Sequence, residues 1–167
     1  MLLGKSEILR LIEADPPLIE NYIDLNVQLQ PTGFEPSLSE VRAFTSHGYL
    51  DFYNKRRRIA DTIPLPFKNG RVHLPPGAYL AVFNEKVNIP LNIAAIAKPR
   101  SSLLRSGVSV ETAVWDPGYS GRSRALIIVY NRHGFTVEKN ARLIQMIFLR
   151  VTGDVGEGYK GVYQGEE

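Results

Sequence analysis

The feature that most constrains the fold is a succession of short apolar runs, separated by turn residues, which begins after Tyr49. The runs have the length of strands, and the Pro, Gly and Asn residues between them favour turns. Strands are predicted at Tyr79–Phe83, Ile93–Ala97, Val108–Trp115, Ala125–Tyr130, Phe135–Val137 and Leu143–Val151. Turns are predicted at Pro75–Gly77, Asn84–Glu85, Pro117–Gly118, His133–Gly134 and Lys139–Asn140. Many short strands at this spacing indicate a sandwich, barrel or jelly roll rather than a parallel sheet.

One helix is predicted, near the N-terminus. Ser6 can cap it, Ile8 and Ile12 repeat at helical spacing, and Pro16–Pro17 ends it. The closing stretch GDVGEGYKGVYQGEE holds five of the 14 glycines and no apolar period, which predicts a flexible tail. We therefore expect a single domain over residues 1–167, with a helix and leading segment (1–45), a β-barrel (46–151) and a flexible tail (152–167).

Composition excludes several classes of protein. The 167 residues are 44% hydrophobic and 22% charged, which is enough apolar material for a folded core. The absence of cysteine excludes disulfides, thiolate metal sites and the zinc-dependent nucleobase deaminases, whose metal needs cysteine ligands. A net charge of +3 suits anionic ligands but does not by itself indicate nucleic-acid binding. No signal peptide or membrane-length apolar run is recognisable, so we expect a cytoplasmic protein with no membrane partner and no stable nucleic-acid partner.

Two kinds of residue are interpreted as structural. His47, His73 and His133 are scattered and share no metal-ligand spacing. The basic run Lys55–Arg58 is interpreted as a solvated loop, because short basic motifs are weak signals.

The first segment that could carry chemistry is KPRSSLLRSG, Lys98–Gly107, directly after a predicted strand. Its two arginines and three hydroxyls match the oxygens of phosphate groups. The alternative is a polar loop with a capping serine.

The second segment is VWDPGYSGR, Val114–Arg122. Asp116 follows an apolar strand and precedes a rigid turn, a position that suits a general base. The alternative is that Asp116 only initiates the turn before proline. In the third segment, KNARLIQMIF, Arg142 and Gln145 enter an apolar strand and mark either a site or a strand end.

In order and spacing, these three segments resemble the shared motifs of the trimeric deoxyuridine triphosphatases and the zinc-free deoxycytidine triphosphate deaminases. Three further stretches, LIENYIDLNVQLQPTGFEPSL, LPPGAYLAVFNEKVNIP and YKGVYQG, are similar to the deaminase-like, archaeal-type branch of this superfamily. The likeness covers nearly the whole chain. It implies an all-β, distorted jelly-roll β-barrel that assembles as a homotrimer, with active sites shared between subunits.

The resemblance also implies roles for individual residues. Asp116 is the catalytic base that activates a water for attack on the α-phosphorus of dUTP, with Mg²⁺ held mainly by the triphosphate and water rather than by the protein. Tyr119 packs under the deoxyribose, while backbone groups around Val108–Ala113 read uracil. The implied substrate-binding residues are Arg100, Ser101, Ser102, Arg105, Tyr119 and Gln145, with Tyr159, Lys160, Tyr163 and Gln164 in a tail that closes over the ligand.

Glu35 and Arg142 are given supporting roles. The first motif usually carries an aspartate after its Gly–aromatic pair, whereas TGFEP has Glu35 followed by Pro36. Arg142 is expected either to neutralise phosphate or to orient Asp116. The tail also lacks the Phe-containing motif of typical triphosphatases, which leaves open what covers the uracil.

Within the superfamily the sequence favours the diphosphatase. The zinc-free deaminases use a glutamate in the strand after the Asp-Pro-Gly turn, but no Asp or Glu occurs from Pro117 to Val137, and an apolar residue near Ile128 takes that place. A dCTP deaminase or a bifunctional deaminase–diphosphatase is the nearest alternative. A hydrolase for another deoxynucleotide, such as dTTP, and a non-catalytic nucleotide-binding regulatory barrel are the others.

Overall fold

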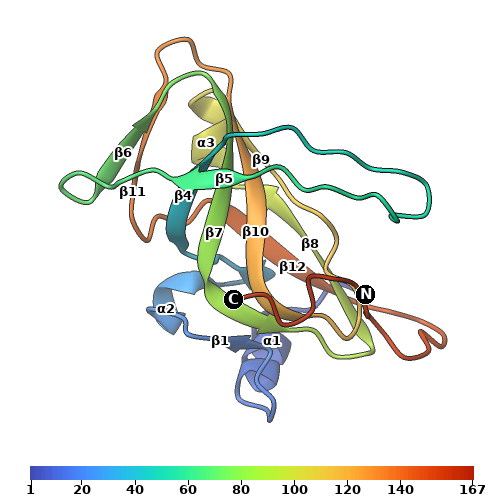
Figure 1. The fold of residues 1–167 in the computed structure, drawn as a ribbon. Helices are drawn as coiled ribbons and strands as arrows, with labels where there is room; N and C mark the ends of the chain where they lie inside the picture. Colours follow the sequence, from blue (N-terminus) through green and yellow to red (C-terminus); the bar gives the residue numbers. More distant parts are fainter.

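Two antiparallel sheets form the body of the protein in the computed structural model, which describes residues 1–167 (Figure 1). The larger sheet contains β1 (Ile19–Glu20), β4 (Leu38–Phe44), β5 (Thr62–Pro64), β7 (Gly77–Asn88), β9 (Val108–Glu111) and β10 (Ser120–Val129). The smaller sheet contains β2 (Leu29–Gln30), β3 (Gly33–Phe34), β8 (Ile93–Pro99) and β12 (Ile144–Arg150). A two-stranded ribbon of β6 (Arg71–Leu74) and β11 (Phe135–Glu138) completes the strands.

Three short helices accompany the sheets, namely α1 (Lys5–Ile12), α2 (Leu25–Gln28) and α3 (Ser101–Arg105). The predicted Ser6 cap is wrong, because Gly4 occupies the N-cap position of α1 without a side-chain cap, and Ser6 lies inside the helix. Leu103 of α3 is buried, so part of the polar segment that follows β8 is helical.

The core lies between the inner faces of the two sheets. Alternating residues of β10 and β12 are buried, as expected for strands with one face on a core. Phe83 and Ile127 of the larger sheet and Met146 and Phe148 of the smaller one belong to a single cluster of buried residues. The all-β fold predicted from the short apolar runs is confirmed.

A backbone bridge joins β8 of the smaller sheet to the segment between β9 and β10, next to Asp116. Trp115 and Ala95 exchange both amide hydrogen bonds, each with an N···O distance of 2.9 Å. The predicted strand Val108–Trp115 is therefore interrupted: β9 ends at Glu111, and Trp115 pairs with β8 instead.

One predicted turn is wrong. Asn84–Glu85 lies inside β7, which continues for 12 residues and pairs with β4, β10 and β1. The two polar side chains are accommodated there because both have partners: Glu85 accepts hydrogen bonds from Ser37, and Asn84 donates one to the Ser37 hydroxyl.

The leading segment 1–45 supplies strands as well as helices. Its strands β1 and β4 pair with β7, and its strand β3 pairs with β12.

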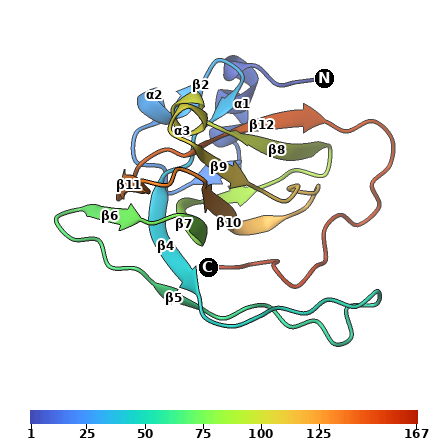
Figure 2. The same cartoon turned by 90° about the horizontal axis from the view of Figure 1, so that it is seen from above.

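The loop between β4 and β5 extends away from the barrel as a long arm in both views (Figures 1 and 2). At its tip, Phe52 is 91% exposed.

Gly33 allows β3 to cross close to β12. A Cβ atom at this position would lie 2.3 Å from the carbonyl oxygen of Met146, a distance that real side chains do not reach. We predict that Gly33→Ala lowers the free energy of unfolding by about 1–3 kcal/mol, as overpacking of a filled site usually does. Ser6→Ala is the control, because Ser6 is exposed inside α1, where alanine is well tolerated. Equal chemical-denaturation midpoints for the two variants would contradict the prediction.

Candidate functional site

The predicted site residues are divided between two pockets that share no lining residue. The first, here the aspartate pocket, has a volume of about 520 Å³ and is lined by Asp116, Tyr119, Tyr159 and Tyr163 among others. The second, here the arginine pocket, has a volume of about 430 Å³ and is lined by Glu35, Lys98, Pro99, Arg100, Ser101, Gln145 and Ile147. One chain therefore presents two separate groups of predicted site residues.

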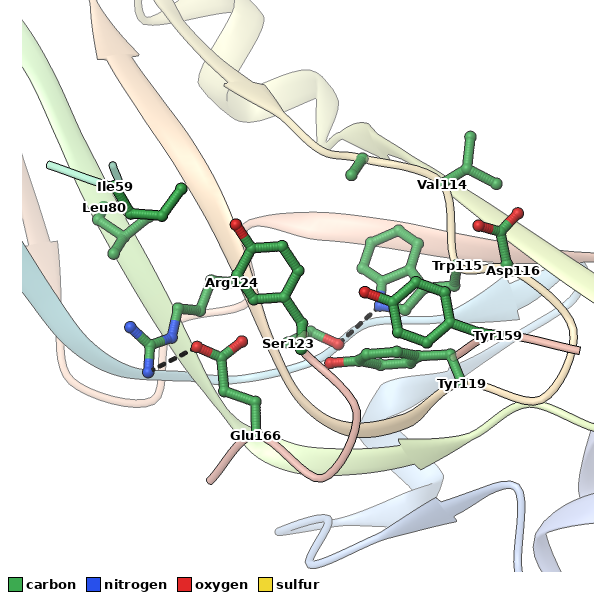
Figure 3. A pocket seen from close by; sticks show the side chains of 12 residues that line it. Ile59, Leu80, Val114, Trp115, Asp116, Tyr119, Ser123, Arg124, Tyr159 and Glu166 are labelled. Carbon is green, nitrogen blue, oxygen red and sulfur yellow. Dashed lines mark hydrogen bonds and ion pairs between the residues drawn. The ribbon is translucent and has the colours of Figure 1, made fainter. Parts of the chain in front are cut away.

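The backbone around Asp116 is held on both sides. Trp115 is fixed to β8 by its bridge with Ala95, and the Trp115 indole donates a 2.8 Å hydrogen bond to the Ser123 hydroxyl of β10. After Asp116, Gly118 adopts a φ of +85°, and the Tyr119 amide donates to the Asp116 carbonyl oxygen at 3.1 Å. The Asp116 carboxylate is exposed at the rim of the pocket, where it can reach a ligand or a water molecule (Figure 3).

Tyr119 forms the floor of the aspartate pocket. It is only 8% exposed, and its ring meets that of Tyr159 edge to face, with centroids 5.5 Å apart (Figure 3). Burial, with smaller contributions from the nearby Glu166 carboxylate and Tyr159, raises the pKa of the Tyr119 phenol to about 12. Tyr119 is therefore a neutral aromatic surface at physiological pH.

The tail folds back over the aspartate pocket of its own chain. The Gln164 side-chain amide donates to the Gly118 carbonyl and accepts from the Ser120 amide, both at 3.1 Å. The Tyr159 amide donates to the carbonyl oxygen of Pro117 at 2.7 Å. The tail, which the sequence predicts to be flexible, contains no strand or helix, and hydrogen bonds connect it to the turn that carries Asp116.

Not every predicted tail residue reaches this pocket. Tyr159 and Tyr163 line it, and Gln164 anchors the segment from outside, whereas Lys160 is exposed and pairs with Glu157. The expected place of Lys160 in the site is thus not seen in the single chain.

Sequence reasoning missed an ion pair at the end of the tail. Glu166 pairs with Arg124 of β10 at 2.9 Å, and both side chains line the aspartate pocket (Figure 3). The Arg122 amide also donates to the Glu166 carbonyl at 2.7 Å. No local pattern indicates this contact, because the two segments meet only when the tail returns to β10.

Glu35 organises the arginine pocket. Its carboxylate is 5% exposed and lies between two guanidinium groups, 2.9 Å from Nε of Arg100 and 2.6 Å from a terminal nitrogen of Arg142. Arg142 also donates to the Val27 carbonyl at 2.7 Å, and Arg100 donates to the Arg142 carbonyl at 3.3 Å. The glutamate of the altered TGFEP motif therefore positions the arginines of two other predicted segments.

A second buried carboxylate lies behind Glu35. Glu85 is 1% exposed and accepts hydrogen bonds from the Ser37 amide, the Ser37 hydroxyl and the Gln28 side chain, at 2.6–2.8 Å. Gln28 in turn donates to the Glu35 carbonyl at 3.1 Å. These contacts satisfy the buried polar groups and link the backbone of Glu35 to β7.

The remaining predicted residues lie around the arginine pocket. Ser101 and Gln145 line it, and the Gln145 amide donates to the Thr32 hydroxyl at 3.3 Å. Ser102 and Arg105 are exposed on α3 and do not line either pocket. Arg142 does not line the arginine pocket either, but it forms an ion pair with Glu35, which does. Lys98, which sequence reasoning did not select, is part of the lining.

Two further observations concern metals and membranes. No group of three or more His, Cys, Asp or Glu side chains is placed to hold a metal ion. No helix has the length and apolar character needed to cross a membrane.

Comparison with curated proteins finds similar archaeal chains. A probable deoxyuridine 5'-triphosphate nucleotidohydrolase of Methanosarcina mazei is 52% identical over 166 residues, covering 99% of this chain and 97% of the relative. A protein of Archaeoglobus fulgidus with the same description is 44% identical, covering 99% and 96%. The deoxyuridine 5'-triphosphate nucleotidohydrolase of Methanocaldococcus jannaschii is 35% identical, covering 83% and 88%.

Among solved structures, a 2'-deoxycytidine 5'-triphosphate deaminase from Agrobacterium tumefaciens matches with a TM-score of 0.67 at 21% identity. The match covers 90% of this chain and 48% of the deaminase chain, and it shows a shared fold. The family model described as dCTP deaminase-like matches residues 2–151, which include both pockets' strands. On the strength of this match and of the archaeal relatives, the chain belongs to the dCTP deaminase-like family.

Proposed function

We propose that this protein is a dUTP diphosphatase, which hydrolyses dUTP to dUMP and pyrophosphate and so keeps uracil out of DNA. The observation that carries the proposal is the complementary chemistry of the two pockets. One offers an exposed carboxylate above a neutral aromatic floor, and the other offers cations and an amide suited to phosphate oxygens. The descriptions of the archaeal relatives support the same activity.

In the proposed reaction, the aspartate pocket takes the nucleoside and the α-phosphate. The Asp116 carboxylate accepts a proton from a water molecule, whose oxygen forms a bond to the α-phosphorus. The bond between the α-phosphorus and the bridging oxygen breaks, and pyrophosphate leaves with the electron pair. Exposure of the carboxylate at the rim supports this role, because a general base must reach the water it deprotonates.

The arginine pocket takes the phosphates that leave. Arg100, Ser101 and Gln145 would hydrogen-bond the phosphate oxygens and stabilise the negative charge that develops on them. Ser102 would add a hydroxyl from α3. Arg105 is exposed, which supports a contact with a neighbouring subunit or with the phosphate segment.

The proposed metal is Mg²⁺, carried to the site by the triphosphate. The described side chains offer no cluster of three ligating groups, which fits an ion held by phosphate oxygens and water. When bound there, Mg²⁺ would neutralise phosphate charge.

We also propose that the complete site forms between copies of the chain in a homotrimer. The two pockets of one chain share no lining residue, which supports a site that a second copy completes. The outer faces of β8 and β12 carry Ile96, Ile147 and Leu149, which are only partly buried in the single chain. Such an apolar face beside the arginine pocket suits a contact with a different face of a second copy. When this contact repeats around a threefold axis, three copies form a closed ring.

Selectivity for the deoxynucleotide would arise in the aspartate pocket. Tyr119 would pack under the deoxyribose, where an additional 2′-hydroxyl would lose its hydrogen-bond partners. Backbone groups of residues 108–113, which comprise β9 and the two residues after it, would read uracil. Tyr159 and Tyr163, with Gln164 and Lys160 in the same segment, would close over the ligand.

The experiment that tests this function measures pyrophosphate and ammonia release from dUTP, dCTP, dTTP and UTP in the presence of Mg²⁺. Rapid release of pyrophosphate from dUTP alone, without ammonia, is expected. No ammonia is expected from dCTP, because β10 carries no carboxylate and the other acid lining the aspartate pocket, Glu166, is paired with Arg124. Binding of dUTP without turnover would instead indicate a regulatory barrel.

Removal of the proposed base should abolish most turnover. Asp116→Asn keeps the shape of the side chain but cannot accept the proton, so we predict a fall in kcat of roughly 10²–10⁴-fold with little change in dUTP binding. Asp154→Asn is the matched control, because its oxygen can still accept the 2.8 Å hydrogen bond from Gly156. A kcat for Asp116→Asn close to that of the control would exclude Asp116 as the base.

Loss of the Glu35 carboxylate should disorganise the arginine pocket. We predict that Glu35→Gln lowers the free energy of unfolding by roughly 1–3 kcal/mol, less than for fully buried pairs because both arginines are partly exposed, and also raises KM for dUTP. Glu40→Gln, which breaks the more exposed pair with Arg42, should cost less than about 1 kcal/mol and leave KM unchanged. Thermal denaturation and steady-state kinetics on the two variants separate the effects; equal KM values would contradict the prediction.

The buried phenol of Tyr119 should ionise at a higher pH than an exposed tyrosine. Because the pKa of Tyr119 is raised to about 12, the folded chain keeps this phenol protonated at a pH where the unfolded chain ionises it, near pH 10. The contribution of Tyr119 to stability is therefore complete below about pH 10 and is lost as the pH rises towards 12. Tyrosinate absorbance should show a step near pH 12 that Tyr119→Phe removes and Tyr53→Phe retains. An unchanged step in Tyr119→Phe would show that the signal has another origin.

A further inference from the structure

We propose that Lys98, with Arg100, is a cation that lines the arginine pocket and binds the pyrophosphate portion of the substrate, the part that leaves in the reaction. This inference deepens the proposed function and rests on it for the identity of the substrate. The contact itself, between a cationic pocket and a pyrophosphate group, can be tested without turnover.

The strand register places Lys98 in the lining of the arginine pocket. Lys98 of β8 lies directly opposite Gln145 of β12 in the antiparallel register. Side chains directly opposite one another in such a pair project from the same face of the sheet. The Gln145 amide is on the outer face, where it contacts Thr32 and lines the arginine pocket. Lys98 therefore projects into the same pocket, two residues before Arg100.

The cations around the arginine pocket differ in how far they are already paired within the chain. The guanidinium groups of Arg100 and Arg142 are both paired with the single carboxylate of Glu35. Each also donates to a backbone carbonyl, so part of its hydrogen-bonding capacity is already used. Lys98 takes part in none of the ion pairs of the chain, and its ammonium group is exposed. It is the lining cation whose donors are all free for a ligand.

Lys98 also brings the positive charge around the arginine pocket to the level that a magnesium-bound triphosphate requires. Arg100, Arg142 and Glu35 together leave one net positive charge, whereas a triphosphate that carries one Mg²⁺ retains two negative charges near neutral pH. Lys98 supplies the second positive charge. An ammonium group suits this role, because it acts as a compact charge that does not depend on one fixed geometry of the phosphate chain.

The test measures binding of inorganic pyrophosphate with Mg²⁺, of a non-hydrolysable α,β-imido analogue of dUTP, and of dUMP, by calorimetry on the assembled protein. For Lys98→Met we expect Kd to rise about tenfold for pyrophosphate and for the analogue, since charged hydrogen bonds contribute on this scale. The Kd for dUMP should change by less than about twofold, because its single phosphate lies in the aspartate pocket. Lys98→Arg should restore most of the lost affinity.

Lys139→Met is the matched control. Lys139 is exposed, makes no ion pair and lines neither pocket, so this variant makes the same change in net charge elsewhere. Wild-type affinity for pyrophosphate in Lys98→Met would overturn the proposal, as would an equal loss of affinity for dUMP or a change in oligomeric state. Absence of dUTP hydrolysis by the wild-type protein would reject the proposed function, while a selective loss of pyrophosphate binding would still stand as support for Lys98.

Discussion

The arrangement of the arginine pocket depends on one buried carboxylate. Glu35 comes from the leading segment, Arg100 from the end of β8, and Arg142 from the segment before β12. A carboxylate that is 5% exposed must be compensated by hydrogen-bonded cations, or its burial would be costly. The same interaction holds the two guanidinium groups in place, so the requirement for charge compensation and the orientation of the two arginines have one physical origin.

The aspartate pocket depends on backbone geometry rather than charge. The bridge between Trp115 and Ala95 fixes the residue before Asp116, and the left-handed conformation of Gly118 turns the chain directly after it. A Cβ on Gly118 would lie 3.1 Å from the Tyr159 amide nitrogen, so the absence of a side chain also permits close approach of the tail. The aspartate and the segment that covers its pocket are thus positioned by the same turn.

The positions of several strands and of most turns could be predicted from the sequence because they are encoded locally. Short apolar runs bounded by turn residues are sufficient to place most of β8 and β12 and the second half of β10. The failures occurred where a distant partner overrides local preference. Asn84–Glu85 has the composition of a turn, yet it continues β7 because Ser37 and Gln28 hydrogen-bond the Glu85 carboxylate. The strand β4 was missed because its polar residues, such as Glu40 and Arg42, find partners at the surface.

For the site, the sequence alone determined which residue types are available and where along the chain they cluster. Asp116, Arg100, Ser101 and Gln145 could be selected as candidates from three short segments, because the order and spacing of these segments resemble the motifs of a known superfamily. Only the tertiary structure decided how these groups are divided, which guanidinium groups are already paired, and that Lys98 and Glu166 lie beside the pockets. These properties depend on contacts between segments far apart in the chain, and such contacts leave no local pattern in the sequence.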